Sequence, residues 1–376
     1  MRLEIRGVKL NVILSIKRRS EYMASNRIVN VGIIGLGGMA NEYLRNISRI
    51  DSIKVSAICD VNQKLLNIIG EQEEVSQDKR FKNIEEIIAS PEVDAIISVV
   101  PNNLHAKVLE LCILYQKPIM AEKPFTLNFE EAENLNLLYQ KKPIPCMIGF
   151  IHRYTPSFQY AKKLLEANKI GKIRHTDVRY HQSFGTPLFN VPYLWRFNKT
   201  ITGTGALGDL GAHMIDSARF FIGEFRSISA LMKTFVDKRR DPITGEERHV
   251  DVDDFTSFQA ILENDVVGNF VTTRNAIGSS NQHEVTLYGD YGTLHVSINR
   301  PNEIDIFVRN KSDGNPVLTT EKVPEIYNKT ILNDFAELIL NKKSQNIPNF
   351  YDGYKNQKVI DRIIYSAEKG HFVKVD

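Results

Sequence analysis

Cysteines and long apolar runs are scarce in this chain of 376 residues, and each scarcity excludes a class of protein. No apolar run approaches the roughly 20 residues that a helix needs to span a bilayer, so we expect no membrane association. The three cysteines, Cys59, Cys112 and Cys146, are too far apart for a Cys-x-x-Cys redox or metal motif. Their odd number predicts buried, reduced thiols in a cytoplasmic protein.

The net charge is also small once the first 22 residues are set aside. The formal net charge is +3, but residues 1–22 contribute six basic and two acidic side chains, which leaves the remainder at −1. No other segment forms a basic stripe, so we expect no nucleic-acid binding. No set of histidines and carboxylates has a spacing typical of metal ligands, so we expect no metal.

The basic N-terminal segment does not fit a secretory signal. Its apolar part, residues 12–14, is short, and the basic cluster at residues 17–19 lies on the wrong side of it. A mitochondrial transit peptide is disfavoured as well. Because the first predicted strand begins soon afterwards, we expect Met23 to be the true start and residues 1–26 to lie outside the fold.

A glycine-rich turn follows that first strand. The apolar run at residues 28–34 predicts a buried strand, and a helical pattern follows the turn. The segment between them spells G-x-G-x-x-A in the strand–turn–helix context that a dinucleotide fingerprint requires. Gly35 permits the tight turn, Gly37 lets the backbone approach a pyrophosphate, and Ala40 lets the helix pack on the strand. The helix N-terminus adds free N–H groups and a positive dipole end. We therefore expect the cofactor at Gly35, Leu36, Gly37, Gly38 and Met39.

The second predicted strand, residues 53–59, ends at Asp60, twenty residues beyond Ala40. A carboxylate there can accept hydrogen bonds from the adenosine ribose hydroxyls, and it repels a 2′-phosphate. No arginine follows directly that could receive such a phosphate, so NAD is favoured over NADP. The combined context disfavours the alternative of an incidental turn and aspartate.

Helices and strands continue to alternate up to residue 150. The pattern predicts helices at 84–90, 104–115 and 128–139, and strands at 94–100, 118–121 and 145–150. Such alternation is typical of a doubly wound parallel sheet, and we expect a nucleotide-binding α/β domain at residues 27–150.

Polar residues gather where these strands end. They form three clusters, at Pro101, Asn102 and His105, at Glu122 and Lys123, and at residues 149–153. Ligands bind beyond the carboxyl ends of parallel strands, so the clusters together predict a nicotinamide and substrate pocket. Lys123 precedes a proline, which restricts its backbone to extended conformations and aims its side chain. A lysine merely paired with Glu122 at the rim is the structural alternative.

The second half of the chain alternates polar and apolar residues in a strand-like way. Strands are expected at 173–183, 227–236, 254–262, 266–275, 283–289, 293–299 and 303–308. We expect a helix at 156–168 and, over residues 151–376, an α+β domain with a largely antiparallel open sheet, one face of which is covered by the helix that begins near Asp209 and continues to residue 221. Two closing helices, at 329–340 and 352–369, are expected to pack back on the first domain. A sheet with one open face predicts a homodimer or homotetramer.

The segment at residues 203–216 supports two interpretations. Gly203, Gly205 and Gly208 spell G-x-G-x-x-G, but no buried strand precedes them, so a second nucleotide site is disfavoured and the glycines are expected to let the backbone pass close to a ligand. Asp209 and His213 lie one helical turn apart, which is typical of a carboxylate that orients a general base. A helix-capping aspartate and a core histidine are the structural alternatives. Asp216, three residues further, is expected to be structural.

Taken in order, these motifs resemble the Gfo/Idh/MocA oxidoreductases, the family of glucose–fructose oxidoreductase and inositol 2-dehydrogenase. The resemblance covers residues 28–376. It rests on residues 35–40, Asp60, Pro101–Asn102, Glu122–Pro124, Gly149 with Arg153, Trp195–Arg196 and residues 209–216. It implies a Rossmann domain followed by the α+β domain, with Lys123, Asp209 and His213 as the catalytic group. Thr204 departs from the all-glycine loop that is common in the family.

The resemblance implies an NAD-dependent dehydrogenase that oxidises a secondary alcohol of a sugar or cyclic polyol. His213 would be the base, Asp209 would hold a substrate hydroxyl or orient the site, and Lys123 would stabilise charge on oxygen and relay the proton. The cofactor contacts would extend over Asp60, Pro101, Asn102, His105, Glu122 and Lys123. The substrate would lie among Arg153, Tyr193, Trp195, Asp209 and His213. Two alternatives stay open: a glycosidase that retains NAD, and a non-catalytic nucleotide-sensing regulator.

Overall fold

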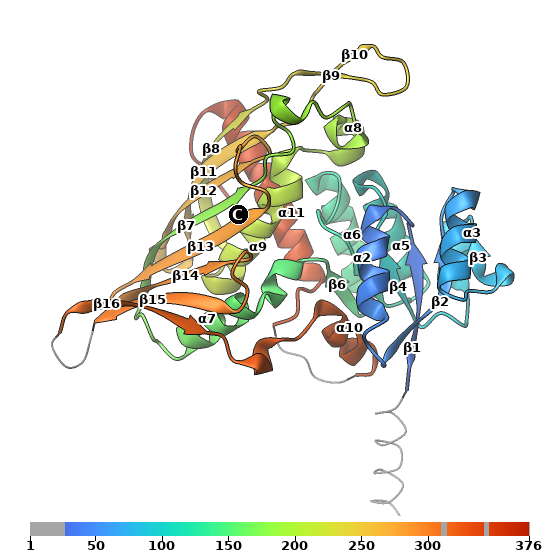
Figure 1. Cartoon of the computed structure of the whole chain (residues 1–376), viewed down its shortest axis with the longest axis horizontal. Coiled ribbons are helices and arrows are strands. Elements are labelled where there is room, and N and C mark those ends of the chain that lie inside the picture. Colours follow the sequence, from blue (N-terminus) through green and yellow to red (C-terminus); the bar gives the residue numbers. More distant parts are fainter. Residues whose placement is uncertain (1–26, 310–313, 342–345, 376) are drawn as a thin grey trace, which may run out of the picture.

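The computed structural model describes residues 27–309, 314–341 and 346–375. The predictions about the N-terminal 26 residues lie outside this part of the chain. Within the described ranges, no helix is both long enough and apolar enough to cross a membrane. The described residues form two sheets with helices between and around them (Figure 1).

The first sheet has six strands in the order β3-β2-β1-β4-β5-β6, and each neighbouring pair is parallel. Its strands are β1 (Val29–Ile34), β2 (Ile53–Cys59), β3 (Arg80–Phe81), β4 (Ala95–Ser98), β5 (Ile119–Ala121) and β6 (Cys146–Ile148). The helices between them are α2 (Gly38–Ile47), α3 (Gln63–Gln72), α4 (Ile84–Ala89), α5 (His105–Leu114) and α6 (Phe129–Lys141). The predicted doubly wound sheet is confirmed. Its strand order reverses between β1 and β4, and this switch point is where such sheets bind ligands.

The second sheet has nine strands in the order β16-β15-β14-β13-β7-β12-β11-β8-β17. They are β7 (Ile173–His181), β8 (Phe225–Lys233), β11 (Phe255–Leu262), β12 (Val267–Thr273), β13 (Gln282–Gly289), β14 (Gly292–Ser297), β15 (Glu303–Arg309), β16 (Pro316–Lys322) and β17 (Val373–Lys374). The pair β7–β12 is parallel and the other pairs are antiparallel, which confirms a mostly antiparallel sheet. The predicted set lacked β16 and β17. It also lacked the short hairpin of β9 (Lys238–Arg240) and β10 (Glu247–His249), which projects from one end of the molecule (Figure 1).

Helices cover one face of the second sheet. α7 (Pro156–Glu166) packs on β14 and β15, α9 (Ala212–Phe221) packs on β7, and α11 (Phe350–Lys369) packs on β8. Both α9 and α11 lie between the two sheets, and α11 also contacts α6 (Figure 1). Burial alternates along these strands, as in β11, so their apolar side chains face the helices.

The helix α10 (Ile331–Ile339) returns to the first sheet. Its Leu332 and Phe335 are buried in one core with Val31 and Ile33 of β1. Because α10 and α11 carry the end of the chain back to the first sheet, the two halves of the molecule share their packing. A division of the chain at residue 150 stays a prediction.

Candidate functional site

A cleft of about 800 Å³ lies between the carboxyl ends of the first sheet and the helix-covered face of the second. Its size falls within the range of small-molecule sites, about 300–1,000 Å³. The first sheet supplies residues of the strand-end loops, and the second half supplies residues of α9, β7 and the segments after β12 and before β13. The residues that line it include Gly35, Gly37, Asp60, Lys123, His152, Tyr180, Trp195, Asp209, His213, Arg274 and Asn281.

The glycine-rich turn opens onto this cleft. Gly35 has a φ of +89°, and a Cβ added there would lie 2.9 Å from the carbonyl oxygen of Val99, so the turn requires glycine. Gly37 is the N-cap of α2, and no side chain caps the helix. A Cβ added at Gly37 or Gly38 would meet no atom within 4 Å, so the space in front of the helix is open. Uncapped N–H groups, the dipole end and this open space fit a dinucleotide pyrophosphate.

Leu36 departs from the predicted cofactor set. Its side chain is buried in the core behind the turn and does not line the cleft. Its N–H donates to Asp60 Oδ2 over 2.8 Å, and the N–H of Asn62 donates to Oδ1 over 2.8 Å. Leu36 therefore orients the Asp60 carboxylate, which faces the cleft at the end of β2, where a ribose would bind.

A buried carboxylate supports the rim after β5. Glu122 Oε1 accepts a hydrogen bond from Tyr43 over 2.7 Å, and Oε2 accepts one from the N–H of Lys123 over 3.1 Å. A Cβ at Gly149 would lie 2.8 Å from Glu122 Oε1, so glycine makes room for this side chain. Burial raises the pKa of Glu122. Glu122 thus holds the backbone of Lys123 through this hydrogen bond.

Lys123 reaches across the cleft to Asp209. Its Nζ lies 3.0 Å from Asp209 Oδ1 and 2.8 Å from the carbonyl oxygen of the same residue. From the other side, Arg274 Nη2 donates to Asp209 Oδ2 over 2.8 Å. Burial alone would raise the pKa of Asp209, but the charges of Lys123 and Arg274 outweigh it and hold the pKa well below its usual range. Asp209 is therefore an anion that binds two cations, and it does not act as a proton-accepting base.

The glycines before Asp209 serve the fold rather than a ligand, contrary to the prediction. A Cβ at Gly205 would lie 1.7 Å from the carbonyl oxygen of Asp253. The buried Asp253 carboxylate accepts hydrogen bonds from the N–H groups of Gly205 and Leu207 over 2.7 and 2.8 Å. The loop then enters a π-helical turn, Leu207–Gly211, which precedes α9. Asp209 of this turn and His213 of α9 both face the cleft.

His213 is buried and neutral. Its side chain is 4% exposed, and its Nδ1 is buried without a hydrogen-bond partner among the described residues. Burial, and then its interactions with the neighbouring His152 ring and the Lys123 ammonium, hold its pKa well below the usual value. No hydrogen bond joins Asp209 to His213 in the described part of the chain, so the expected carboxylate–imidazole pair is replaced by the contact of Asp209 with Lys123 and Arg274.

Comparisons with known proteins agree with this geometry. Residues 29–150 match the family described as "Oxidoreductase family, NAD-binding Rossmann fold", and residues 158–295 match the "GFO/IDH/MocA C-terminal domain". A levoglucosan dehydrogenase of Pseudarthrobacter phenanthrenivorans is 30% identical over 320 residues, which cover 77% of this chain and 82% of the relative. The chain belongs to the Gfo/Idh/MocA family of NAD-binding oxidoreductases.

Other relatives of this Gfo/Idh/MocA protein are also sugar dehydrogenases. A glucose-6-phosphate 3-dehydrogenase of Bacillus subtilis is 26% identical, over 88% of this chain and 94% of the relative. The solved structure of levoglucosan dehydrogenase in complex with NADH and L-sorbose superposes with a TM-score of 0.85 at 27% identity. That match covers 93% of this chain and 99% of the other.

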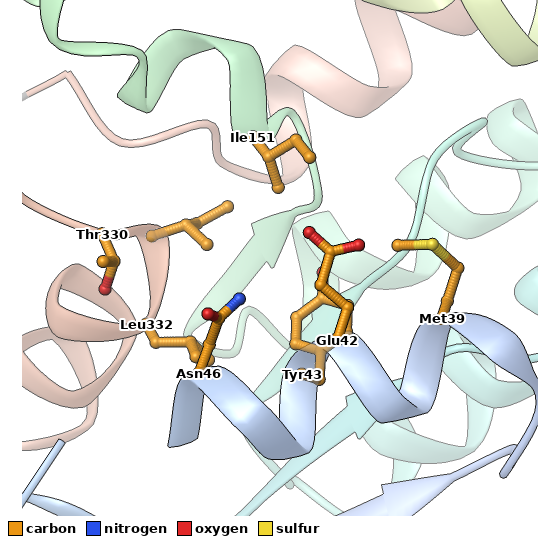
Figure 2. A pocket seen from close by; sticks show the side chains of 8 residues that line it. Met39, Glu42, Tyr43, Asn46, Ile151, Thr330 and Leu332 are labelled. Carbon is orange, nitrogen blue, oxygen red and sulfur yellow. The ribbon is translucent and has the colours of Figure 1, made fainter. Parts of the chain in front are cut away.

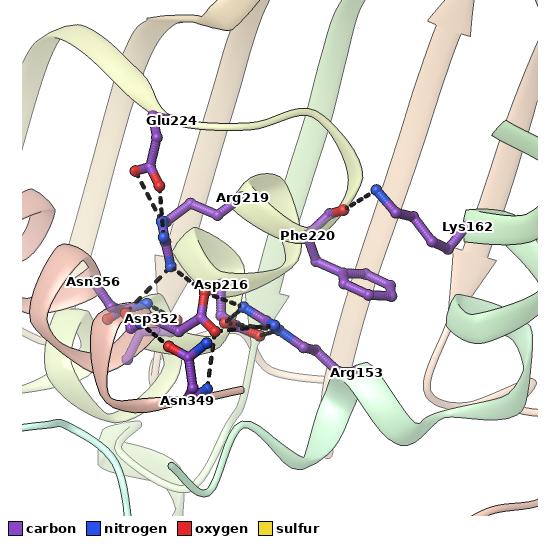
Figure 3. Close-up of polar contacts among 10 residues, drawn as sticks. Arg153, Lys162, Asp216, Arg219, Phe220, Glu224, Asn349, Asp352 and Asn356 are labelled. Atoms are coloured by element: carbon purple, nitrogen blue, oxygen red, sulfur yellow. Dashed lines mark hydrogen bonds and ion pairs between the residues drawn. The ribbon is translucent and has the colours of Figure 1, made fainter. Parts of the chain in front are cut away.

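Arg153, a predicted substrate residue, does not line the cleft and instead takes part in a network of polar contacts, which Figure 3 shows. It is 5% exposed and binds both carboxylate oxygens of Asp216, with Nη2 2.6 Å from Oδ1. It also lies 2.9 Å from Asp352 of α11, which in turn binds Arg219 of α9 over 2.9 Å. This network joins α9, α11 and the turn after β6, so the structural interpretation of Asp216 fits and the substrate role of Arg153 is corrected. The short 3-10 helix Ile151–Tyr154 turns the preceding residue, His152, into the cleft instead.

Of the two other predicted substrate contacts, one lies outside the cleft and the other lines it as expected. Tyr193 is buried with Phe197 and Val250, its ring is covered by the guanidinium of Arg248 at 4.1 Å, and it does not line the cleft. Trp195 does line it and is 42% exposed.

His105 touches the cleft, but both of its ring nitrogens are engaged. Nδ1 lies 2.6 Å from the carbonyl oxygen of Pro124, and Nε2 lies 3.0 Å from that of Val100. The ring therefore ties two strand-end loops together rather than offering a nitrogen to a cofactor. Pro101 and Asn102 do line the cleft, and Asn102 donates to the carbonyl oxygen of Thr202 over 3.1 Å.

Several cleft residues were not assigned a site role from the sequence, although two of them, His152 and Arg196, lie in the predicted cluster at residues 149–153 and in the Trp195–Arg196 motif. The others lie in or next to strands of the second sheet: Tyr180, Gln182, Arg274 and Asn281. Arg274 directly follows β12, so a search of the strand ends in the second half would have found it. His152 adjoins the predicted Arg153, and only the local turn decides which of the two faces the cleft.

A second, much smaller cavity lies between α2 and α10 (Figure 2). It has a volume of about 40 Å³ and is lined by Met39, Glu42, Tyr43, Asn46, Ile151, Thr330, Ile331 and Leu332. A cavity needs about 10–15 Å³ for each water molecule, so this one holds a few waters and no organic substrate.

Proposed function

We propose that this protein oxidises a secondary alcohol of a sugar or cyclic polyol with NAD. One observation carries the proposal: the ion group of Lys123, Asp209 and Arg274 faces the neutral His213 in the cleft onto which the dinucleotide turn opens. An acid–base group at this place serves an enzyme, whereas a nucleotide-sensing regulator does not need one.

NAD bound at this turn would supply the hydride acceptor for the carbinol carbon. The chain would hold it through the N-terminus of α2 and the Asp60 carboxylate, with Pro101, Asn102 and the rim at Glu122 completing the site. The ammonium of Lys123 would stabilise negative charge on the reacting oxygen. Asp209 would keep this ammonium in place, and Trp195 would offer an apolar face to the sugar ring.

His213 would exchange the proton of the reacting hydroxyl through Nε2. Its Nδ1 is buried without a partner, so the single proton of the resting ring favours Nε2. To accept a proton at Nε2, the ring holds its own proton on Nδ1, which costs about 1–3 kcal/mol as an unpaired buried donor. Within the described residues no hydrogen bond fixes either tautomer, so His213 can switch between them at this cost.

The test is formation of NADH at 340 nm with levoglucosan, glucose 6-phosphate, myo-inositol and other aldoses and polyols, with NADP as the cofactor control. We expect saturable NADH formation with at least one of them, and slower turnover with NADP because of Asp60. No turnover with any polyol or aldose would contradict the proposal. Cleavage of a glycoside with bound NAD and without net NADH would favour the alternative, an NAD-retaining glycosidase.

We further propose that the protein forms a homodimer or homotetramer through the open face of the second sheet. Apolar side chains stand exposed on that face, with Leu231 61% exposed and the cross-strand partners Phe307 and Leu318 41% and 64% exposed. Light scattering of the protein and of its Leu231→Lys and Leu318→Lys variants tests this assembly, and a wild-type monomer contradicts it. The three free, buried cysteines support a cytoplasmic location.

A further inference from the structure

Three buried imidazoles from distant parts of the chain touch one another beside the cleft. They are His213 of α9, His152 of the turn after β6, and His283 of β13, with exposures of 4%, 8% and 0%. The rings of His213 and His152 are stacked with centroids 4.0 Å apart. The ring of Tyr180 stacks on His283 at 5.1 Å and closes the group.

His152 and His283 form a hydrogen bond between like atoms. Their Nδ1 atoms are 2.7 Å apart. Burial lowers the pKa of His152 to about 3 and holds that of His283 well below its usual value, so both rings are neutral near pH 7. A neutral imidazole has one N–H and one bare nitrogen. One ring of this pair therefore donates from Nδ1, and the other accepts at Nδ1.

The surroundings of His283 decide the direction of this bond. Its Nε2 is buried without a partner among the described residues, and the nearby ring of Phe158 offers no hydrogen-bond acceptor of ordinary strength. If His283 accepted at Nδ1, its own proton would be an orphaned buried N–H on Nε2, which is rare in folded proteins. We therefore assign the donor role to Nδ1 of His283.

The tautomer of His152 follows from the donor role of His283. Because Nδ1 of His152 accepts, the single proton of His152 lies on Nε2. His152 lines the cleft, and its Nε2 makes no hydrogen bond within the described residues and is not among their fully buried polar atoms. The N–H of His152 therefore faces the space beside His213.

We propose that His283 is a positioning residue that locks His152 as a hydrogen-bond donor to the substrate oxygen next to the one that reacts. The inference rests on the proposed function, because that oxygen belongs to a polyol or sugar. The two histidines that face the cleft would then have different roles. His213 can move its proton between two nitrogens and exchange it, whereas His152 keeps its N–H directed into the cleft.

The first experiment measures the tautomer directly and needs no substrate. Long-range ¹H–¹⁵N correlation spectra of the full-length protein labelled with ¹⁵N-histidine distinguish a protonated from a bare ring nitrogen, and the His152→Phe variant assigns the signals. We expect His152 to be protonated on Nε2 and bare on Nδ1, and His283 to show the reverse. A proton on Nδ1 of His152 overturns the proposal, even if the protein oxidises polyols.

The second experiment uses variants of His283 with a substrate found in the NADH assay. His283→Phe keeps a ring against Phe158 and Tyr180 but removes the donor, and His283→Asn places an amide N–H near the position of Nδ1. We expect His283→Phe to lower kcat/KM about 3- to 10-fold, mainly through KM, and His283→Asn to restore most of the loss.

A double-mutant cycle separates positioning from packing. If His283 acts through His152, adding His283→Phe to His152→Phe lowers kcat/KM no further. Additive losses in the cycle, or equal losses for His283→Phe and His283→Asn, overturn the proposal. If no polyol is turned over, the proposed function fails, and the tautomer measurement still decides whether His283 holds the proton of His152.

Discussion

The two walls of the cleft are built in different ways. The cofactor wall, formed by residues 35–39, Asp60 and the loop at Pro101–Asn102, follows from short segments at the ends of neighbouring strands. The substrate wall, formed by His152, Asp209, His213 and Arg274, joins segments far apart in the chain. Asp209 is 86 residues from Lys123 and 65 from Arg274. One wall is thus specified by local sequence, and the other by tertiary packing.

This difference explains where charge and protons are controlled. The cofactor wall offers backbone N–H groups and one carboxylate held by backbone donors. The substrate wall is a buried group of ionisable side chains whose pKa values are shifted by burial and by one another. Perturbed groups of this kind gather where proton transfer occurs. We therefore expect that mutations can affect cofactor binding and catalysis separately.

The largest expected effect comes from removing the acid–base groups. Lys123→Met and His213→Ala should each lower kcat about 10²- to 10⁴-fold, because each removes a group that handles charge or a proton in the transition state. NAD affinity, measured by titration calorimetry, should stay within a few-fold, since the cofactor wall is intact. Normal turnover in both variants would remove these roles and with them the proposed distinction between the walls.

The second effect is a loss of stability in acid, and it arises mainly from the substrate wall. The pKa values of His152, His213 and His283 lie below the unfolded value of about 6.5, so the unfolded chain binds more protons as the pH falls through that value. The stability that these neutral imidazoles contribute is thus fully present above pH 6.5 and is lost as the pH falls. For His152 the loss continues down to its folded pKa of about 3. One unit below 6.5, each imidazole costs about 1 kcal/mol, or a few kcal/mol for the three.

Urea unfolding at pH 7.5 and pH 5.5 measures this loss. His105 at the start of α5, outside both walls, contributes with the same sign, since burial also lowers its pKa. His283→Phe should reduce the difference in the free energy of unfolding between the two pH values by about 1 kcal/mol. Equal stability at both values would show that the three imidazoles are not buried in the neutral form.

The contrast between the walls also marks what the sequence could predict. The cofactor turn, Asp60 and the position of Lys123 follow from patterns within a few residues, and the structure places them at one cleft. The choice between His152 and Arg153 could not be predicted, because a single 3-10 turn decides which faces the ligand. The position of Arg274 at a strand end could be found from the sequence, but its pairing with Asp209 of another element could not, because no local pattern reveals such a pair.

Glycines on the two walls give a matched pair of variants for stability. Gly205→Ala should destabilise the fold by about 3 kcal/mol, because its Cβ would overlap the backbone of Asp253. Gly37→Ala should change stability by less than about 1 kcal/mol, since its Cβ meets no atom, and should instead weaken NAD binding by filling the pyrophosphate space. Thermal unfolding and NAD titration of both variants test this. A stable Gly205→Ala, or unchanged NAD affinity in Gly37→Ala, would contradict the roles given to these glycines.

The smallest effect should come from the Asp60 carboxylate. Asp60→Ala should weaken NAD binding about 10-fold, the magnitude of a charge-assisted hydrogen bond, and should narrow the preference for NAD over NADP. Turnover at saturating NAD should stay unchanged, because Asp60 lies at the ribose end of the cleft and not near Lys123 or His213. Kinetics with NAD and NADP at a fixed substrate concentration measure both quantities. A fall in kcat at saturating NAD would mean that the orientation of the cofactor, and not only its affinity, depends on Asp60, and the two walls would then be coupled rather than separable.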